Sequence, residues 1–230
     1  MKRPDVAIHS QEASIACLHG LGDSAQILQQ QTAAIRYELS DHYTYEFVEG
    51  ATPWERSNQD AALSEEPTFT YCHPEQADSC LRTIHDLDQF FEDEGPFDGI
   101  IGFGLGASLA ILWLKNKQEA LDMGDITNLP VKVVIMFSTS YVHDYRVLAK
   151  GNTVGLDPSP AGARLDLPSA HIWGAEDPFI SLAQAGAEFF NHDRLSTHIH
   201  DRGHGIPSAM EDVVQVAKAI NQAIVAISLA

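Results

Sequence analysis

The 230-residue chain has few basic residues and few cysteines, and it lacks a long apolar run. Fourteen Lys and Arg stand against 32 Asp and Glu, and the net charge of −18 disfavours binding to nucleic acid phosphates or anionic lipids. No stretch approaches the roughly 20 apolar residues that span a bilayer, and residues 1–5 lack the apolar run of a signal peptide. We therefore expect a cytoplasmic protein without a nucleic acid or membrane partner.

Metal-binding and nucleotide-binding motifs are also missing from the sequence. Cys17, Cys72 and Cys80 are scattered without the spacing of metal ligands, and we interpret them as structural thiols. His198 and His200 alternate along an expected strand, but no third zinc ligand accompanies them. The chain has neither a Walker A sequence nor a dinucleotide fingerprint with its following acidic residue. The sequence therefore predicts neither a metal nor a cofactor.

The sequence does contain the alternation of strands and helices that is typical of a mostly parallel α/β sheet flanked by helices. Its length suits one domain over residues 1–230, and 44% hydrophobic residues are ordinary for a globular protein. We expect strands at 14–18, 43–48, 97–101, 131–137, 170–173 and 196–200, and helices at 25–39, 75–94, 107–119 and 207–227. Residues 49–74 and 144–167 lack a clear period, so we expect a loop beside a site and a minimal cap over the sheet edge.

Three turns at strand ends carry the residues of acyl-transfer chemistry. In α/β serine hydrolases the nucleophile lies in G-x-S-x-G at a strand-to-helix turn, and an Asp and then a His follow later in the chain. Here residues 102–106 read Gly-Phe-Gly-Leu-Gly, and Asp177 and His204 each follow an expected strand. This order predicts that Asp177 orients His204 as a general base, and that Gly104 occupies the position of the nucleophile.

The same turns offer backbone N–H groups for a developing oxyanion. Leu105 follows the nucleophile position, and Leu21 and Gly22 lie in the turn after the first strand. Alternatively, these glycines only permit positive φ in tight turns or cradle a phosphate. Trp54 and Tyr141 lie near strand ends and are candidates to line a pocket for a large apolar or aromatic substrate, although ordinary packing also explains them.

These motifs together carry a resemblance to a known family. They comprise Leu18-His19-Gly20-Leu21-Gly22 with Gln31-Thr32, Phe47-Val48-Glu49-Gly50, Gly102 to Ser108, Gly174 to Pro178, and Gly203-His204. In this order they resemble the FSH-type fungal serine hydrolases, and the first motif is also similar to acyl-protein thioesterases. The resemblance implies a compact α/β-hydrolase acting on esters and thioesters. Several members are encoded with fungal polyketide pathways, where they release or trim the product.

Gly104 is the departure from that family, which has its nucleophilic serine at this position. Glycine has no side chain to attack a carbonyl, so an acyl-enzyme cannot form there. Ser108 lies one helical turn further on, and Ser138 and Ser140 follow another strand, so none of them stands in the elbow. Either the serine was replaced by engineering, or this is a natural member that has left acyl transfer behind.

Three functions for a small-molecule carbonyl, ester or thioester substrate remain open from the sequence. In the first, His204 acts as a base beside an oxyanion hole and catalyses condensation, cyclisation or a weaker hydrolysis by water. In the second, the protein is an ester or thioester hydrolase inactivated by a Ser-to-Gly substitution at position 104. In the third, it is a non-catalytic binding protein for an apolar ligand, which has no need of the Asp177–His204 pair.

Overall fold

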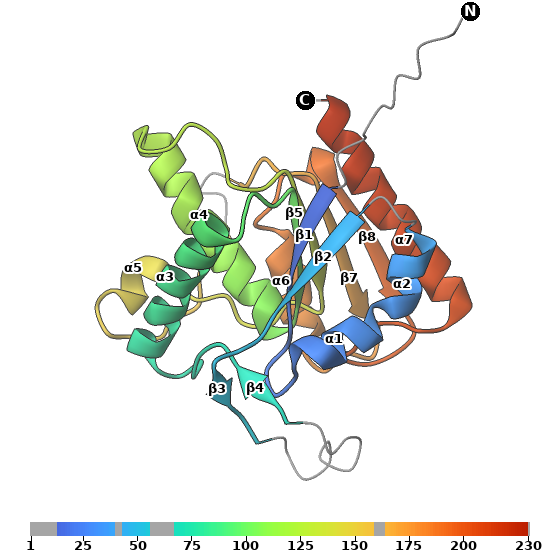
Figure 1. Ribbon diagram of the computed structural model, residues 1–230, viewed down its shortest axis with the longest axis horizontal. Helices are drawn as coiled ribbons and strands as arrows, with labels where there is room; N and C mark the ends of the chain where they lie inside the picture. Colours follow the sequence, from blue (N-terminus) through green and yellow to red (C-terminus); the bar gives the residue numbers. More distant parts are fainter. Residues whose placement is uncertain (1–12, 40–42, 56–66, 159–163, 230) are drawn as a thin grey trace, which may run out of the picture.

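A sheet of six parallel strands forms the centre of the protein in a computed structural model that describes residues 13–39, 43–55, 67–158 and 164–229 (Figure 1). The strand order is β2-β1-β5-β6-β7-β8. Its strands are β1 (Ala13–Leu18), β2 (Tyr43–Val48), β5 (Gly99–Phe103), β6 (Val133–Phe137), β7 (Ser169–Gly174) and β8 (Leu195–His200). The short antiparallel pair β3 (Thr52–Pro53) and β4 (Phe69–Thr70) lies at the end of the molecule where the parallel strands finish.

The inner strands of the sheet are mostly apolar because helices cover both of their faces. Every residue of β5, β6 and β7 is buried, whereas the edge strands β2 and β8 are partly exposed. Successive side chains point to opposite faces. Ile100 pairs with Val134 and both enter one core cluster, while Ile101 and Ile135 enter the other.

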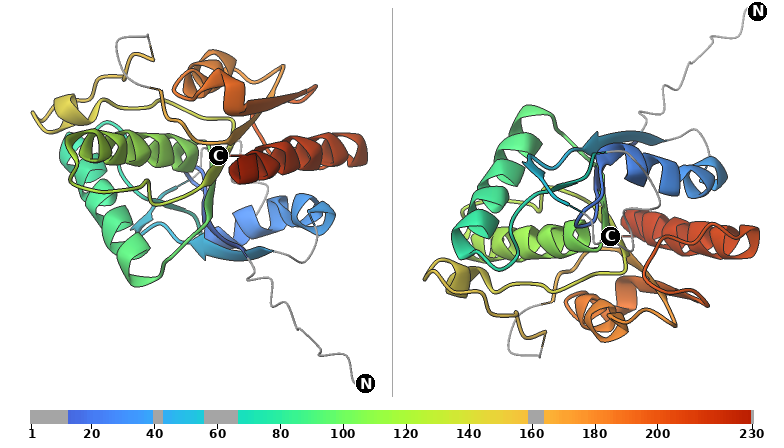
Figure 2. Two further views of the ribbon diagram at one scale, coloured as in Figure 1. Left: turned by 90° about the horizontal axis from the view of Figure 1, so that it is seen from above. Right: turned by 90° about the horizontal axis from the view of Figure 1, so that it is seen from below.

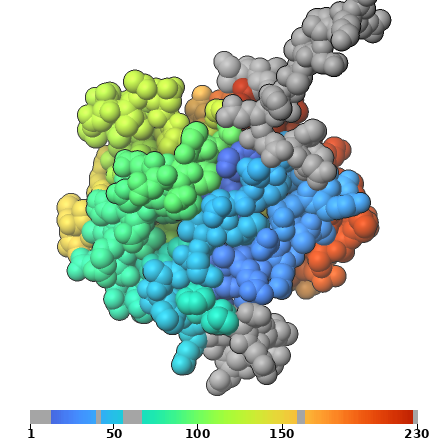
Figure 3. All heavy atoms as spheres, viewed as in Figure 1, coloured from blue at the N-terminus to red at the C-terminus, as the bar shows by residue number. Residues whose placement is uncertain are grey.

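Two groups of helices enclose the sheet (Figure 2). The helices α3 (Ala77–Asp93) and α4 (Leu105–Met123) cover one face, and α1 (Ala25–Gln31), α2 (Ala33–Glu38) and α7 (Met210–Val225) cover the other. In the space-filling view, segments from the first half of the chain, coloured blue to green, form most of the face toward the viewer (Figure 3). The remaining α-helices of the described chain are α5 (Tyr145–Leu148) and α6 (Ile180–Ala187).

The predicted strands and the α/β fold class are confirmed, with strand ends shifted by at most two residues. The helix expected at 25–39 is instead divided at Thr32 into α1 and α2. The hydroxyl of Thr32 donates to the carbonyl of Leu28 (2.7 Å), which also accepts the N–H of Thr32 (3.0 Å). The helix expected at 107–119 is longer, and it ends at Gly124 in the left-handed region. The helices α5 and α6 were not predicted, because α5 has only four residues and α6 is short and rich in small residues, so neither shows a clear period.

In the part of the chain that the structure describes, no helix is both long enough and apolar enough to span a membrane.

His171 is a titratable residue in the middle of the sheet. It lies on β7, is 1% exposed, and has no hydrogen-bond partner for either ring nitrogen among the described residues. Burial lowers the pKa of His171 to about 3 from an ordinary value of 6.5. The folded protein therefore keeps this ring neutral under conditions in which the unfolded chain protonates it.

This difference makes stability depend on pH. The contribution of neutral His171 is complete above pH 6.5 and is lost as the pH falls toward about 3. Between pH 7 and pH 5 we expect His171 to remove about 2 kcal/mol from the free energy of unfolding. Urea denaturation of wild type and His171→Met at both pH values measures this, because the variant should escape that part of the loss. Parallel pH dependence in the two proteins would contradict the assignment.

Candidate active site

The turn from β5 into α4 is made by Gly104, which adopts φ 52° and ψ −112°. Its N–H donates to the carbonyl of Phe137 (3.0 Å), and its carbonyl accepts from the N–H of Ser140 (3.3 Å). Residues with side chains are strained at this φ, whereas glycine is not. A Cβ built on Gly104 would lie 3.6 Å from Nε2 of His204 and 3.7 Å from Cα of Gly20. Position 104 therefore faces the imidazole with room for a small side chain.

Gly106 allows α4 to begin directly beside the end of β1. A Cβ at this residue would overlap the carbonyl of Leu18, so a larger residue would push the helix away from the strand. The close approach places the first residue of α4, Leu105, opposite the turn that follows β1. Leu21 in that turn and Leu105 line the same cavity.

His204 and Asp177 form a hydrogen-bonded pair beside this turn. Asp177 follows β7, and its Oδ2 accepts from Nδ1 of His204 at 2.9 Å, while its Oδ1 accepts the N–H of Phe179 (2.8 Å). The carboxylate is fully buried, and the imidazole, which follows β8, is 30% exposed. A carboxylate accepts only, so it fixes the proton of the neutral ring on Nδ1 and leaves Nε2 as a base that faces position 104.

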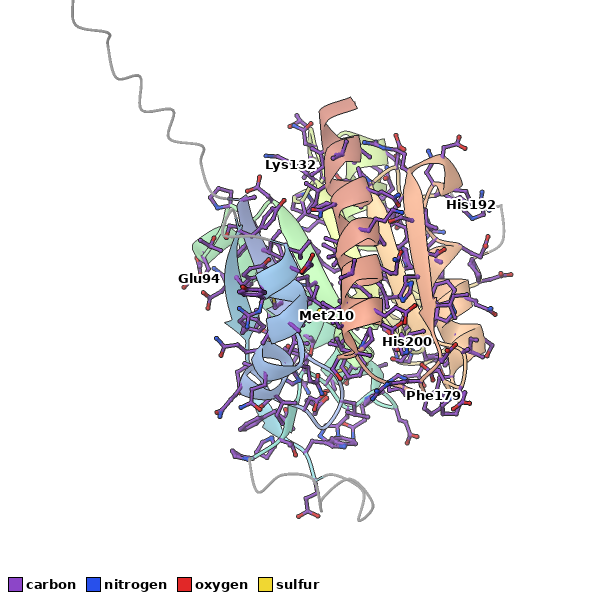
Figure 4. The ribbon with its side chains drawn as sticks, turned by 90° about the vertical axis from the view of Figure 1, so that its right-hand side faces the viewer. Glu94, Lys132, Phe179, His192, His200 and Met210 are labelled. Atoms are coloured by element: carbon purple, nitrogen blue, oxygen red, sulfur yellow. The ribbon has the colours of Figure 1, made fainter. Side chains whose placement is uncertain are left out.

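Two aromatic rings hold the imidazole of His204 in place. The ring of Phe103 lies 5.3 Å from it and that of Phe179 lies 5.6 Å from it in an edge arrangement. Phe179 lies at the same end of β8 as His200, the last residue of this strand, whereas His192 lies at the opposite end (Figure 4). The base is thus located at the carboxyl ends of the strands, where sites form in open parallel sheets.

The direction of the Leu21 N–H is set by the buried ring of His19. Nδ1 of His19 donates to the carbonyl of Gly20 (2.8 Å), and Nε2 accepts the N–H of Gly50 (3.0 Å). Burial lowers the pKa of His19 and keeps the ring neutral, against the opposing effect of Glu49, 3.2 Å away. Because the peptide is planar and trans, a carbonyl of Gly20 directed at His19 turns the N–H of Leu21 the opposite way.

The structure corrects the prediction for Gly22. Its N–H donates to the carbonyl of Phe69 (3.0 Å) and joins the turn to β4, so it is already engaged and is not an oxyanion donor. Gly22 has a positive φ of 69°, which glycine adopts without strain, and the turn that it makes lies against β4. The sequence could not reveal this contact because the two residues are far apart in the chain. Gly22 still lines the cavity.

A cavity of about 870 Å³ opens in front of the Asp177–His204 pair. Both predicted pocket residues, Trp54 and Tyr141, line it. Its wall is largely apolar and aromatic and includes Leu21, Trp54, Phe103, Tyr141, Phe179 and Leu182. Such a wall suits an uncharged apolar or aromatic substrate. A second hollow of about 550 Å³, between Glu38 and α7, is remote from this chemistry.

Ser108 and Ser140 form hydrogen bonds at the turn, and none of the three alternative serines stands at position 104. The Ser108 hydroxyl is buried and donates to the carbonyl of Gly104 (3.1 Å) behind the elbow. It also shares a hydrogen bond with the hydroxyl of Ser140 (2.9 Å), which lines the cavity. Ser138 is buried as well, with 1% of its surface exposed. The described residues include no group of three His, Cys, Asp or Glu side chains placed to hold a metal ion.

The family model for "Serine hydrolase (FSH1)" matches residues 9–216. The chain belongs to this family. It is 31% identical over 215 residues to the esterase FPY3 of Fusarium mangiferae, covering 91% of this chain and 96% of that protein. It is 25% identical over 266 residues to the hydrolase FUB4 of Fusarium oxysporum f. sp. lycopersici, covering 92% and 98%. The predicted hydrolase-type enzyme class is thereby confirmed.

Solved carboxylesterase structures share the fold of this FSH1 family member. The Bacillus cereus carboxylesterase aligns with a TM-score of 0.59 and 15% identity over 92% of this chain and 89% of its own. The carboxylesterase of Mesorhizobium loti aligns with a TM-score of 0.57 and 18% identity over 90% and 87%. These likenesses confirm the α/β-hydrolase fold that the motifs predicted.

Three residues of the site were missed in the sequence analysis: His19, Phe103 and Phe179. His19 belongs to the family motif, and its place directly before the Gly20–Leu21 peptide could have indicated its role. Phe179 follows Asp177 by two residues and fixes the carboxylate through its backbone N–H. No local sequence pattern indicates the ring contacts, because they depend on how β5, β7 and β8 come together.

The backbone at Gly104 predicts a cost for any side chain at this position. Since the built Cβ meets no atom closer than 3.6 Å, Gly104→Ala should fold and should lose about 1–3 kcal/mol of unfolding free energy through backbone strain alone. Gly205→Ala is the matched control on the same cavity, because a Cβ there meets nothing within 4 Å and should change stability by less than about 0.5 kcal/mol. Chemical denaturation measures both, and equal stabilities would show that the turn is unstrained.

Proposed function

We propose that the protein is an enzyme of fungal polyketide-type secondary metabolism that acts on a carbonyl, ester or thioester substrate without an acyl-enzyme. His204, oriented by Asp177, removes a proton α to a carbonyl. The N–H groups of Leu21 and Leu105 stabilise the enolate that forms, and condensation or cyclisation follows. The observation that carries the proposal is that Nε2 of His204 faces position 104, where no side chain stands, in a cavity that Leu21 and Leu105 also line.

The space beside Nε2 of His204 supports this reaction class. A Cβ at residue 104 would lie 3.6 Å from Nε2, and in its absence a substrate carbon can take that place. Nε2 then faces a substrate C–H in the way that it would face a serine hydroxyl in a hydrolase. The helix α4 starts at the same point, and the positive end of its dipole favours the negative charge of an enolate oxygen.

The buried acid argues against a pure binding protein. The carboxylate of Asp177 has no exposed surface, and its oxygens accept hydrogen bonds from His204 and from the N–H of Phe179. Burying a charged group is costly even when it is hydrogen-bonded, and an apolar ligand does not require it. A general base requires such a partner, which fixes the tautomer of the ring.

The metabolic setting rests on the family resemblance and on fungal relatives. The FSH-type hydrolases that this sequence resembles include members encoded with polyketide pathways, and the two Fusarium relatives are named an esterase and a hydrolase. The aromatic and apolar cavity wall suits the ring systems of polyketides. The substrate class proposed here is therefore a small polyketide-like carbonyl compound or thioester.

The second candidate is an ester or thioester hydrolase inactivated by the loss of serine at position 104. The observation that favours it is the fit of a serine at the turn, because a Cβ there meets no close atom and points at the base. A serine would complete the nucleophile, base and acid of an acyl-transfer site. The two candidates differ in the product that the unmodified chain releases.

Mass spectrometry of reaction mixtures separates the candidates. We expect the unmodified protein to convert a polyketide-like thioester or reactive carbonyl precursor without hydrolysis, and His204→Ala to slow the conversion by about 10²-fold or more. His198→Ala is the matched control, because His198 also pairs with a carboxylate, Asp212 (3.2 Å), away from the cavity, and should leave the conversion unchanged. Equal rates in wild type and His204→Ala would contradict base catalysis.

Restoring the nucleophile gives a second test. In the proposed enzyme, Gly104→Ser should impair the native conversion, because the hydroxyl takes the place of the substrate carbon beside Nε2. Hydrolysis of a short-chain ester dye by Gly104→Ser, absent in Gly104→Ala and in Gly104→Ser/His204→Ala, would demonstrate a working acyl-transfer site. If the unmodified protein converts none of the tested thioesters and carbonyl compounds, and Gly104→Ser releases free acid from one of them, the protein is an inactivated hydrolase.

A further inference from the structure

Two cysteines that are separate in the sequence meet behind the wall of the cavity. Cys72 lies between β4 and α3, and Cys80 lies in the first turn of α3. Their Sγ atoms are 3.4 Å apart, and neither residue has exposed surface. Cys17 is in β1 and belongs to the core cluster on the opposite face of the sheet. The chain thus has one thiol pair and one thiol remote from it.

The surroundings of the pair differ from those of the remote thiol. The hydrogen bond with Cys72, together with the nearby ring of His143, lowers the pKa of Cys80, against the effect of burial. Burial raises the pKa of Cys17. Because the thiolate is the reactive form of cysteine, Cys80 is better suited than Cys17 to start an oxidation, with Cys72 beside it to complete the reaction. Since both thiols are buried, a hydroperoxide reaches them when the segment between β4 and α3 opens locally.

The pair is joined to the cavity through the residues that follow Cys72. The ring of His73 lies 5.3 Å from the ring of Trp54, and Trp54 and Pro74 both line the cavity. The Cys80 sulfur also contacts the carbonyl oxygens of His73 (3.6 Å) and Pro74 (3.8 Å). Any movement of Cys72 toward Cys80 is therefore transmitted to this part of the wall.

We propose that Cys72 and Cys80 form a reversible disulfide on reaction with a hydroperoxide, and that this bond repositions the cavity wall at Trp54 and Pro74. The proposal is independent of the reaction proposed for His204. A disulfide brings two sulfurs to about 2.05 Å, so the pair must close by more than 1 Å. The helical backbone holds Cys80, and the displacement falls on the short segment that carries Cys72 and Pro74.

The reaction balances with one hydroperoxide, for which hydrogen peroxide is the simplest case. The Cys80 thiolate attacks the O–O bond, which breaks to give a sulfenic acid and hydroxide; the hydroxide takes up the proton that Cys80 lost. The Cys72 sulfur then attacks the sulfenic sulfur, the S–S bond forms, the S–O bond breaks, and water leaves. Two thiols are oxidised by two electrons, the peroxide is reduced to two waters, and a small dithiol reverses the change.

Counting thiols tests the bond. The folded full-length protein is treated with hydrogen peroxide, denatured, labelled with N-ethylmaleimide and weighed. We expect the number of labels to fall from three to one and to return to three after dithiothreitol, with a Cys72–Cys80 peptide in the digest. Cys17→Ala should still lose two thiols, and Cys72→Ala should form no intramolecular disulfide. Three labels after peroxide treatment, oxygen added to single cysteines, or a bridge to Cys17 would overturn the proposal.

Tryptophan fluorescence tests the link to the wall. The chain has three tryptophans, of which Trp54 is the one in contact with His73. Forming the disulfide should change the emission of the wild type, and the change should be absent in Trp54→Phe although that variant still loses two thiols. A change that persists in Trp54→Phe, or no change in the wild type after complete oxidation, would show that the bond does not move the wall.

Discussion

The arrangement of the site depends on the sharp turn by which β5 becomes α4. A backbone with positive φ at Gly104 reverses the chain within one residue, and Gly106 lets the new helix lie against the end of β1. The turn is tied to the neighbouring strand β6, since Gly104 donates to Phe137 and accepts from Ser140. If this contact opened, position 104, the N–H of Leu105 and the floor of the cavity would all move. A rigid turn is therefore needed to keep position 104 opposite the Asp177–His204 pair.

Backbone groups, and not Lys or Arg side chains, are the source of positive charge at the cavity, whose described lining includes one carboxylate, Asp23. The first turn of α4, a 19-residue helix, has backbone N–H groups without intrahelical partners and lies at the positive end of the helix dipole. The protein as a whole carries a net charge of −18, and the described lining of the cavity has no Lys or Arg. In the function that we propose, the negative charge that forms during the reaction is stabilised by backbone N–H groups, whereas an anion approaching from solvent meets a repulsive surface. The proposed site therefore favours neutral substrates.

The sequence was sufficient for the fold and for the partners of the dyad. Continuous apolar runs fixed the inner strands, and the order of the glycine turn, Asp177 and His204 located three corners of the site, because each lies directly after a strand end in the chain. Features that depend on contacts between distant segments were not predictable. The bond from Gly22 to Phe69 is one example, and the meeting of Cys72 and Cys80 is another. The two thiols are eight residues apart, a spacing that does not indicate contact, and only the fold of the segment between β4 and α3 brings them together.

The positive φ at position 104 also has a consequence for how this site can change over generations. A serine at position 104 holds its backbone at a φ that costs about 1–3 kcal/mol, a large share of the 5–15 kcal/mol by which ordinary proteins are stable. Exchanging that serine for glycine removes the cost, so the loss of the nucleophile strengthens the fold in a single substitution. The reverse exchange weakens it again. Serine at position 104 is thus more easily lost than regained, and the reaction that we propose, which needs only the base, is compatible with the more stable glycine turn.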